Sequence, residues 1–251
     1  MTLWLIGGTC ESAELVGQLG PACACVITVT TERAKQLYPH CVHPVVVTRL
    51  TPATIDAFCQ HHHIHQILDM SHPHAAHISQ LAIQYAQEHH IPYLRYERPH
   101  LMTSHPHVYY WQDLTELCTS HLFRQWQAER ILVTLGYRQL PLLKPVWGTH
   151  QWFVRILPDA VALGTALETG FPPQHIIALW PPVPLALERA LWQHWRITQV
   201  IAKASGRPGG EDVKQQLAQE LGVGLHLIQR PPIAYPQWTD DLEVALAFAR
   251  K

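Results

Sequence analysis

Two glycine-rich segments of the sequence have the composition of anion-binding turns. Residues 7–12 read Gly-Gly-Thr-Cys-Glu-Ser after the apolar run 3–6, and residues 205–210 read Ser-Gly-Arg-Pro-Gly-Gly shortly after Lys203. Glycine lets the backbone approach a phosphate closely, and a helix that begins there offers free N–H groups and a positive dipole end. We predict anion binding at both, with the second as the stronger candidate. A tight strand–helix turn with a capping serine is the alternative for the first.

Neither segment matches a strict nucleotide motif, since the chain contains no G-x-G-x-x-G and no P-loop G-K-[ST]. The candidate cofactor-binding residues of the first turn are Gly7, Gly8, Thr9 and Ser12. The candidate ligand-binding residues of the second are Ser205, Gly206, Gly209 and Gly210.

Hydroxyl groups end the second predicted strand, where residues 28–31 read Thr-Val-Thr-Thr. Folds that prefer NAD usually place an acid there for the ribose hydroxyls. Thr30 and Thr31 with the nearby Arg33 suit a 2′-phosphate instead, so the sequence favours NADP over NAD. Glu32 is evidence against this, and an ordinary polar turn is the alternative.

Polar side chains also follow the fourth predicted strand, in residues 69–74, which read Asp-Met-Ser-His-Pro-His. Ser71 could cap the following helix and Pro73 suits its first turn. An Asp and two His at the end of a buried strand are unusual for a simple turn, however. We therefore expect Ser71 and His72 to face a ligand.

Two arginines lie at the end of the fifth predicted strand. Arg95 and Arg98 could present guanidinium forks to a substrate carboxylate, and Arg155 could do so from the second half of the chain. The alternative is that one of them pairs with Glu97.

These segments follow strands in a chain where short apolar runs alternate with amphipathic stretches. Strands are predicted over residues 3–6, 23–30, 45–47, 64–70, 93–96, 131–135, 152–157, 176–180, 199–204 and 225–229. Helices are predicted over residues 12–19, 51–62, 75–88, 113–126, 159–168, 185–195, 211–221 and 240–249. Such alternation is typical of parallel sheets with helices on both faces, in which ligands bind beyond the carboxyl ends of the strands.

Two runs of about five strands each predict an α/β protein of two Rossmann-like domains with mainly parallel sheets and an interdomain cleft. We assign residues 1–99 to a cofactor-binding domain, 100–129 to a connecting segment, and 130–251 to a second domain that contributes to the cleft.

Composition excludes several classes of protein. With 18 basic and 19 acidic residues the formal charge is −1, so there is no basic excess to hold a nucleic-acid backbone. The apolar N-terminal run is too short for a signal peptide, and no window approaches the roughly 18 apolar residues of a membrane span. We expect a cytoplasmic protein with no membrane or nucleic-acid partner.

Histidine is abundant, with 19 residues, and four of them lie in the run 61–65. This run crosses from a predicted helix end into a strand, so its side chains point in several directions, whereas a metal site needs converging ligands. We predict no metal site there. The six cysteines include no C-x-x-C and are interpreted as reduced thiols.

Several of these segments, in order, resemble one family. The chain resembles the precorrin-6A and cobalt-precorrin-6A reductases of cobalamin biosynthesis over residues 3 to about 231. The resemblance lies in residues 7–12, 28–31, 69–75, 91–99 (Ile-Pro-Tyr-Leu-Arg-Tyr-Glu-Arg-Pro), 155–158 and 203–210.

The resemblance implies two Rossmann-like domains and reduction of a double bond in a carboxylate-rich macrocycle, with NADPH as hydride donor. It implies that Gly8, Thr9 and Ser12 bind the phosphates and that Thr30 and Thr31 bind the adenosine end. It implies that His72, Arg95, Arg98 and the 205–210 loop line the substrate cleft. The proton could come from His72, Lys203 or bound water.

The chain departs from the family pattern in places. The turn after residue 31 lacks the glycine of S-x-x-G-R, residues 134–136 read Thr-Leu-Gly in place of T-T-G, and Ala204 replaces an aspartate. A two-domain nucleotide-sugar glycosyltransferase and a non-enzymatic, histidine-rich metal-binding protein are the alternative functions.

Overall fold

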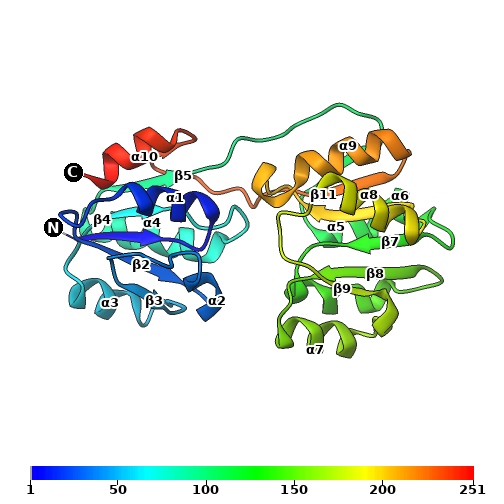
Figure 1. Ribbon diagram of the computed structural model, residues 1–251, viewed down its shortest axis with the longest axis horizontal. Coiled ribbons are helices and arrows are strands. Elements are labelled where there is room, and N and C mark those ends of the chain that lie inside the picture. The colour runs from blue at the N-terminus through cyan, green and yellow to red at the C-terminus, as the bar shows by residue number, and fades with distance from the viewer. Residues whose placement is uncertain (1) are drawn as a thin grey trace. The chain divides into compact units, whose positions relative to one another are not determined.

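The computed structural model describes residues 2–251 and divides the chain into two compact units (Figure 1). Unit 1 contains the chain up to Pro99 together with Pro231–Lys251, and unit 2 contains His100–Arg230. No helix among the described residues is long and apolar enough to cross a membrane.

Unit 1 is built on a six-stranded parallel sheet of order β12-β5-β4-β1-β2-β3 (Figure 1). Its strands are β1 (Thr2–Ile6), β2 (Cys25–Val29), β3 (Val45–Val47), β4 (Ile64–Asp69), β5 (Tyr93–Tyr96) and β12 (Trp238–Thr239). Its helices are α1 (Cys10–Gln18), α2 (Glu32–Lys35), α3 (Ile55–His61), α4 (Ala76–His89) and α10 (Leu242–Ala249).

Alternate residues of the central strands fill two separate cores in unit 1, because successive side chains of a strand point to opposite faces. Leu3 and Leu5 pack with Leu15 of α1 and Leu246 of α10 on one face. Trp4 and its neighbours pack with α3 and α4 on the other. Both faces are thus covered, as expected for a parallel sheet.

Unit 2 is built on a second parallel sheet, of order β6-β11-β10-β7-β8-β9. Its strands are β6 (Val108–Trp111), β7 (Arg130–Val133), β8 (Gln151–Ile156), β9 (Ile176–Ala178), β10 (Gln199–Lys203) and β11 (Gly224–Ile228). Its helices are α5 (Leu114–Thr119), α6 (His121–Arg124), α7 (Ala160–Thr169), α8 (Leu185–His194) and α9 (Glu211–Leu221), with 3-10 stretches η1 (Tyr137–Val146), η2 (Pro173–His175) and η3 (Arg207–Gly209).

The two faces of the second sheet are covered in the same manner. Leu114, Leu140 and Ala166, from α5, η1 and α7, lie in the core on one face. Trp192 of α8 and Leu217 of α9 lie in the core on the other. The predicted α/β class with parallel sheets is confirmed; the interdomain cleft stays a prediction.

Both ends of the predicted second domain differ from the observed one. Residues 231–251 belong to unit 1, because Trp238 pairs with Arg95 in the sheet and α10 buries Ala245 and Leu246 in its core. Residues 100–129, predicted to be a connecting segment, belong to unit 2, because β6 pairs along β11. The chain therefore passes between the units twice, after Pro99 and after Arg230.

One predicted helix of unit 2 is observed as two shorter helices. The helix predicted over residues 113–126 is broken into α5 and α6 at Ser120, whose backbone is extended and whose side chain caps α6 by accepting from the Phe123 N–H. Serine favours such caps because its hydroxyl competes for backbone donors.

In doubly wound folds, ligands bind at the edge of the sheet where the strand order reverses. Apart from the outermost strands β12 and β6, each unit follows the order 3-2-1-4-5 of doubly wound folds, which reverses between its first and fourth strands. In unit 1 this switch point lies beyond β1 and β4, and in unit 2 beyond β7 and β10. Both predicted anion turns follow one of these four strands.

Candidate cofactor and substrate site

The turn between β1 and α1 is tightly closed by its own hydrogen bonds. Thr9 caps α1, accepting from the Ser12 N–H, while Ser12 Oγ accepts from the Thr9 N–H in a reciprocal capping box. Gly8 has a φ of +96°, a region that favours glycine. Thr9 Oγ1 donates to the carbonyl of Met70 at 2.9 Å, which ties this turn to the segment after β4.

Tyr38, from the segment between α2 and β3, completes this turn. Its hydroxyl oxygen accepts from the Gly8 N–H at 2.8 Å and lies 2.6 Å from Ser12 Oγ. A Cβ on Gly7 would lie 2.3 Å from the same oxygen. The missing side chain of Gly7 thus leaves room for the Tyr38 oxygen at the start of α1.

The residues predicted to hold the adenosine end lie where β2 ends. Thr31 caps α2 by accepting from the Ala34 N–H at 3.0 Å, so its hydroxyl has a structural role. Thr30 is exposed and Arg33 is half-buried. These three side chains lie at the carboxyl end of the strand beside β1, where a nucleotide bound at the β1 turn would extend.

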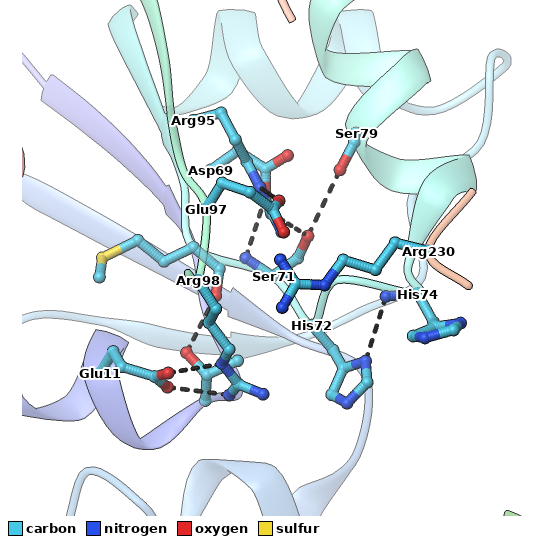
Figure 2. Close-up of polar contacts among 12 residues, drawn as sticks. Glu11, Asp69, Ser71, His72, His74, Ser79, Arg95, Glu97, Arg98 and Arg230 are labelled. Carbon is cyan, nitrogen blue, oxygen red and sulfur yellow. Dashed lines mark hydrogen bonds and ion pairs between the residues drawn. The ribbon is translucent and has the colours of Figure 1, made fainter. Parts of the chain in front are cut away.

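A buried network of charged side chains contacts the segment that follows β4 (Figure 2). Asp69 Oδ1 accepts from the Ser71 N–H at 3.0 Å and from Arg95 Nη1 at 2.9 Å, and its Oδ2 accepts from the Tyr93 hydroxyl at 2.8 Å. Arg95 also donates to Ser71 Oγ at 3.0 Å and to Glu97 at 2.8 Å. The network fixes the backbone and the hydroxyl of Ser71 at the sheet edge.

Charge compensation decides the ionisation of this network. Burial raises the pKa of the Asp69 carboxyl, but the Arg95 guanidinium and the hydrogen bonds from Ser79 and Ser71 outweigh burial and hold its pKa below the usual value. Burial and the Asp69 carboxylate together raise the pKa of the Tyr93 hydroxyl. Asp69 is therefore a buried carboxylate that accepts hydrogen bonds and positions its neighbours.

The two predicted carboxylate-binding arginines are both engaged by acids of the chain. Arg95 is 1% exposed, and its guanidinium is held by Asp69 and Glu97, so it has the pairing role that was the alternative to substrate binding. Arg98 forms a two-point contact with Glu11 of α1, at 2.5 and 2.9 Å (Figure 2). Arg155 pairs with Glu188. The sequence placed these residues at strand ends and offered Glu97 as a partner for one arginine, but it did not indicate Asp69, Glu11 or Glu188 as partners.

His72 is half-buried, and its Nδ1 accepts from the His74 N–H at 3.2 Å (Figure 2). In its neutral form the ring therefore carries its proton on Nε2. Because Ser71 is fixed by Asp69 and Arg95, the adjacent His72 is presented at the switch point of unit 1.

Charged side chains of α9 bind the backbone groups of the glycine loop after β10. The Gly206 N–H donates to Glu211 Oε2 at 2.7 Å, and Lys214 Nζ donates to the carbonyls of Gly209 and Gly210 at 3.1 and 3.0 Å. Burial raises the pKa of Glu211, and burial lowers that of Lys214 to about 8. A Cβ on Gly209 would lie 1.9 Å from Ser205 Oγ, so this glycine permits close packing within the loop.

Lys203 ends β10 at the switch point of unit 2. Its pKa is lowered by burial and by the nearby Arg138 of η1. Among residues 2–251, no carboxylate forms an ion pair with Lys203 or Arg138. Two cations without acidic partners thus lie at this edge of unit 2, and sequence reasoning identified only Lys203.

The histidine run lies elsewhere, at the end of α3 and the start of β4, with His61 and His63 exposed. Within the described part of the chain, no three His, Cys, Asp or Glu side chains are grouped to hold a metal ion.

Two parallel sheets of this strand order, with a glycine turn at the switch point of unit 1, define a protein of two Rossmann-like units. The sequence profile of the family described as "Precorrin-6x reductase CbiJ/CobK" matches residues 2–250. The chain is 42% identical to the cobalt-precorrin-6A reductase of Synechocystis sp., covering 100% of this chain and 96% of that protein.

A second relative, the cobalt-precorrin-6A reductase of Priestia megaterium, is 30% identical over 92% of this chain and 91% of its own length. A solved structure, "CobK precorrin-6A reductase", shares the fold with a TM-score of 0.78 at 18% identity, over 99% of this chain and 95% of the other. The chain belongs to the precorrin-6x reductase family.

The sequence did not indicate the roles of Tyr38, or of Asp69, Glu11 and Glu188 as partners of the arginines, since these contacts join residues far apart in the chain. The pairing of a buried Asp at a strand end with an Arg at the next strand end was the available signal for the Asp69–Arg95 pair.

Proposed function

We propose that this protein reduces a double bond of the precorrin-6A or cobalt-precorrin-6A macrocycle, with NADPH as the hydride donor. The proposal rests on the relative that is 42% identical over the full chain and is named a cobalt-precorrin-6A reductase. The family implies a nicotinamide cofactor; the choice of NADPH over NADH is the finer part of the proposal.

Unit 1 has the features needed to bind the dinucleotide. The place of a Gly7 side chain is taken by one oxygen, that of Tyr38, which accepts from the Gly8 N–H at the start of α1, where backbone N–H groups favour anions. Arg33 and the exposed Thr30 would supply the cation and hydroxyl for a 2′-phosphate, and Glu32 adjoins Arg33 in sequence. We assign the pyrophosphate to this turn and the adenosine end to the end of β2.

When bound, NADPH supplies the hydride; the protein's own groups must orient the ring and deliver a proton. His72 offers the N–H of Nε2, held at the switch point by the Asp69 network. Lys203 offers an ammonium group whose lowered pKa eases proton release. Bound water is the third candidate donor.

Substrate carboxylates require cations that the chain has not already paired. Lys203 and Arg138 meet that condition in unit 2, beside the loop of Ser205 and Gly206. Arg95 contributes indirectly, by fixing Ser71 and His72. Arg98 remains a candidate substrate contact whose guanidinium Glu11 already orients.

Calorimetric titration with NADPH, NADH, UDP-sugars and Zn²⁺, followed by steady-state reduction of precorrin-6A and its cobalt form, tests the proposal. We expect NADPH to bind more tightly than NADH, and turnover with one or both macrocycles. Equal binding of NADH and NADPH would reject the 2′-phosphate assignment alone. Selective binding of a UDP-sugar or of Zn²⁺, without turnover, would favour the glycosyltransferase or the metal-binding alternative.

A further inference from the structure

The hydroxyl of Tyr38 lies inside the turn to which we assign the cofactor's pyrophosphate. Tyr38 is 30 residues from Gly8 in sequence, follows α2, and is 7% exposed. Its oxygen is within hydrogen-bond distance of both the Gly8 N–H and Ser12 Oγ. A tyrosine that only filled the core would not require its oxygen to take the space left by a missing Gly7 side chain.

The direction of these hydrogen bonds follows from proton counting. Ser12 has one hydroxyl proton and lies 2.7 Å from the carbonyl of Thr9, which can only accept, so that proton goes to Thr9. At 2.6 Å, Tyr38 must then donate to Ser12 Oγ, and its own oxygen accepts from Gly8. This series of hydrogen bonds runs from the Gly8 N–H through the Tyr38 and Ser12 hydroxyls to the Thr9 carbonyl, and each of its donors has an acceptor.

A phosphate oxygen cannot take the place of the Tyr38 oxygen on the Gly8 N–H while Tyr38 stays there, because the N–H has one proton and Tyr38 accepts it at 2.8 Å. The phenol is neutral, since burial raises its pKa, so it makes a weaker hydrogen bond than a phosphate anion would. Replacing the Tyr38 hydroxyl by a phosphate oxygen on the Gly8 N–H is therefore favourable. Because the hydrogen bond to Tyr38 is lost at the same time, the nucleotide binds less tightly than it would to a free Gly8 N–H.

We propose that Tyr38 gates the dinucleotide site: its hydroxyl closes the glycine turn in the free protein and leaves the Gly8 N–H when the pyrophosphate binds. Tyr38 thereby sets the affinity for the nucleotide. This inference rests on the proposed binding of a nicotinamide dinucleotide at the β1 turn. It requires no change in the fold of unit 1, only a movement of the segment that carries Tyr38.

Calorimetric titration of NADPH into wild-type protein and Tyr38→Phe tests the gate. Removing the hydroxyl leaves the Gly8 N–H free for the anion, so we expect Tyr38→Phe to bind NADPH roughly three- to tenfold more tightly. Tyr85→Phe is the matched control: Tyr85 is a buried tyrosine in α4, packed on the opposite face of the same sheet. It should bind NADPH as the wild type does, even if its melting temperature falls.

Any other result of these titrations would contradict either the proposed role of Tyr38 or the proposed function. An unchanged dissociation constant for Tyr38→Phe, with lower thermal stability, would show that Tyr38 is merely structural, and weaker binding would show that its hydroxyl contacts the bound nucleotide. Wild-type protein that binds neither NADPH nor NADH would overturn the proposed function itself. If Tyr38→Phe does not fold, Tyr38→Met, which keeps an apolar side chain, takes its place in the same titration.

Discussion

The turn after β1 and the loop after β10 both leave a central strand at the switch point of their sheet, and both are rich in glycine. They differ in what occupies their backbone donors. In unit 1 the Gly8 N–H donates to the neutral hydroxyl of Tyr38, and in unit 2 the Gly206 N–H donates to the carboxylate of Glu211. A phosphate can displace a phenol, but in unit 2 it would have to displace a buried anion.

This difference reverses the order in which composition ranked the two segments. The 205–210 loop has more glycines, yet its backbone groups are already bound by charged side chains of α9. Glu211 accepts from the Gly206 N–H, and Lys214 donates to two of the loop's carbonyls. In unit 1 the charged groups pair with one another, in the Asp69–Arg95–Glu97 network and between Glu11 and Arg98, and the Gly8 N–H binds a neutral group. We therefore assign the nucleotide to unit 1 and a structural role to the glycines of the second loop.

The largest expected effect concerns the buried charges of unit 1. Asp69→Asn keeps the shape of the side chain but leaves Glu97 as the one carboxylate paired with Arg95 among the described residues, and breaking a buried pair typically costs about 3–5 kcal/mol of stability. Urea unfolding of Asp69→Asn at pH 7 should show a loss near the lower value, because Glu97 remains. Asp56→Asn, at an exposed position on α3, should unfold as the wild type does.

The same carboxylate sets a pH dependence. Since the pKa of Asp69 is depressed in the folded protein, its contribution is fully present above the unfolded pKa of about 4 and is lost as the pH falls further. The stability difference between wild type and Asp69→Asn should therefore shrink in acid. A difference that is constant from pH 7 to pH 3 would show that the Asp69–Arg95 charge pair is not what stabilises this edge.

The next largest effect is on nucleotide binding at the β1 turn. Valine at Gly8 would meet no steric obstacle nearer than Ala34 Cβ at 3.9 Å, but its φ of +96° is strained for a branched residue. The turn should shift and withdraw the Gly8 N–H, which weakens NADPH binding roughly ten- to a hundredfold for one lost charge-assisted hydrogen bond. Gly170→Val, equally strained at φ +114° in unit 2, controls for general destabilisation. Comparable affinity losses in both variants would remove the evidence for a special role of the β1 turn.

The sequence predicted the central strands of both sheets better than their edge strands and long-range contacts. Apolar runs and glycine positions predicted most of the strands and the turns that follow them, since burial and backbone freedom are local properties. The edge strands β6 and β12 were not predicted, because a Val-Tyr-Tyr-Trp run among His and Pro, or two residues near the C-terminus, pair only through distant partners. The contacts of Gly8 with Tyr38 and of Arg95 with Asp69 were equally invisible, because they arise from tertiary packing, whereas the sequence had already offered the nearby Glu97 as a partner for an arginine.

A smaller effect is expected in the second loop. Glu211→Gln can still accept from Gly206 but loses its charge beside Lys214, so we expect a stability loss of about 1–2 kcal/mol and no change in NADPH affinity. Urea unfolding and calorimetric titration separate the two quantities, with the exposed neighbour Asp212→Asn as control. If Glu211→Gln weakened NADPH binding as strongly as Gly8→Val, the nucleotide would belong in unit 2 and our comparison would be reversed.

The smallest effect is expected from the histidine run. His61, His62 and His63 lie where α3 ends, before β4 begins at Ile64, whereas the functional edge of unit 1 begins at Asp69, where β4 ends. Six strand residues at about 3.3 Å each separate the two edges by roughly 20 Å, too far for an imidazole to reach a ligand at the glycine turn. Changing all three to Gln should leave turnover and NADPH affinity near those of the wild type. Because His61 and His63 are exposed, stability should change little as well. A large loss of turnover with intact stability would mean that the edge bearing His61–His63 also takes part in catalysis, and the assignment of function to the carboxyl ends of the strands would have to be revised.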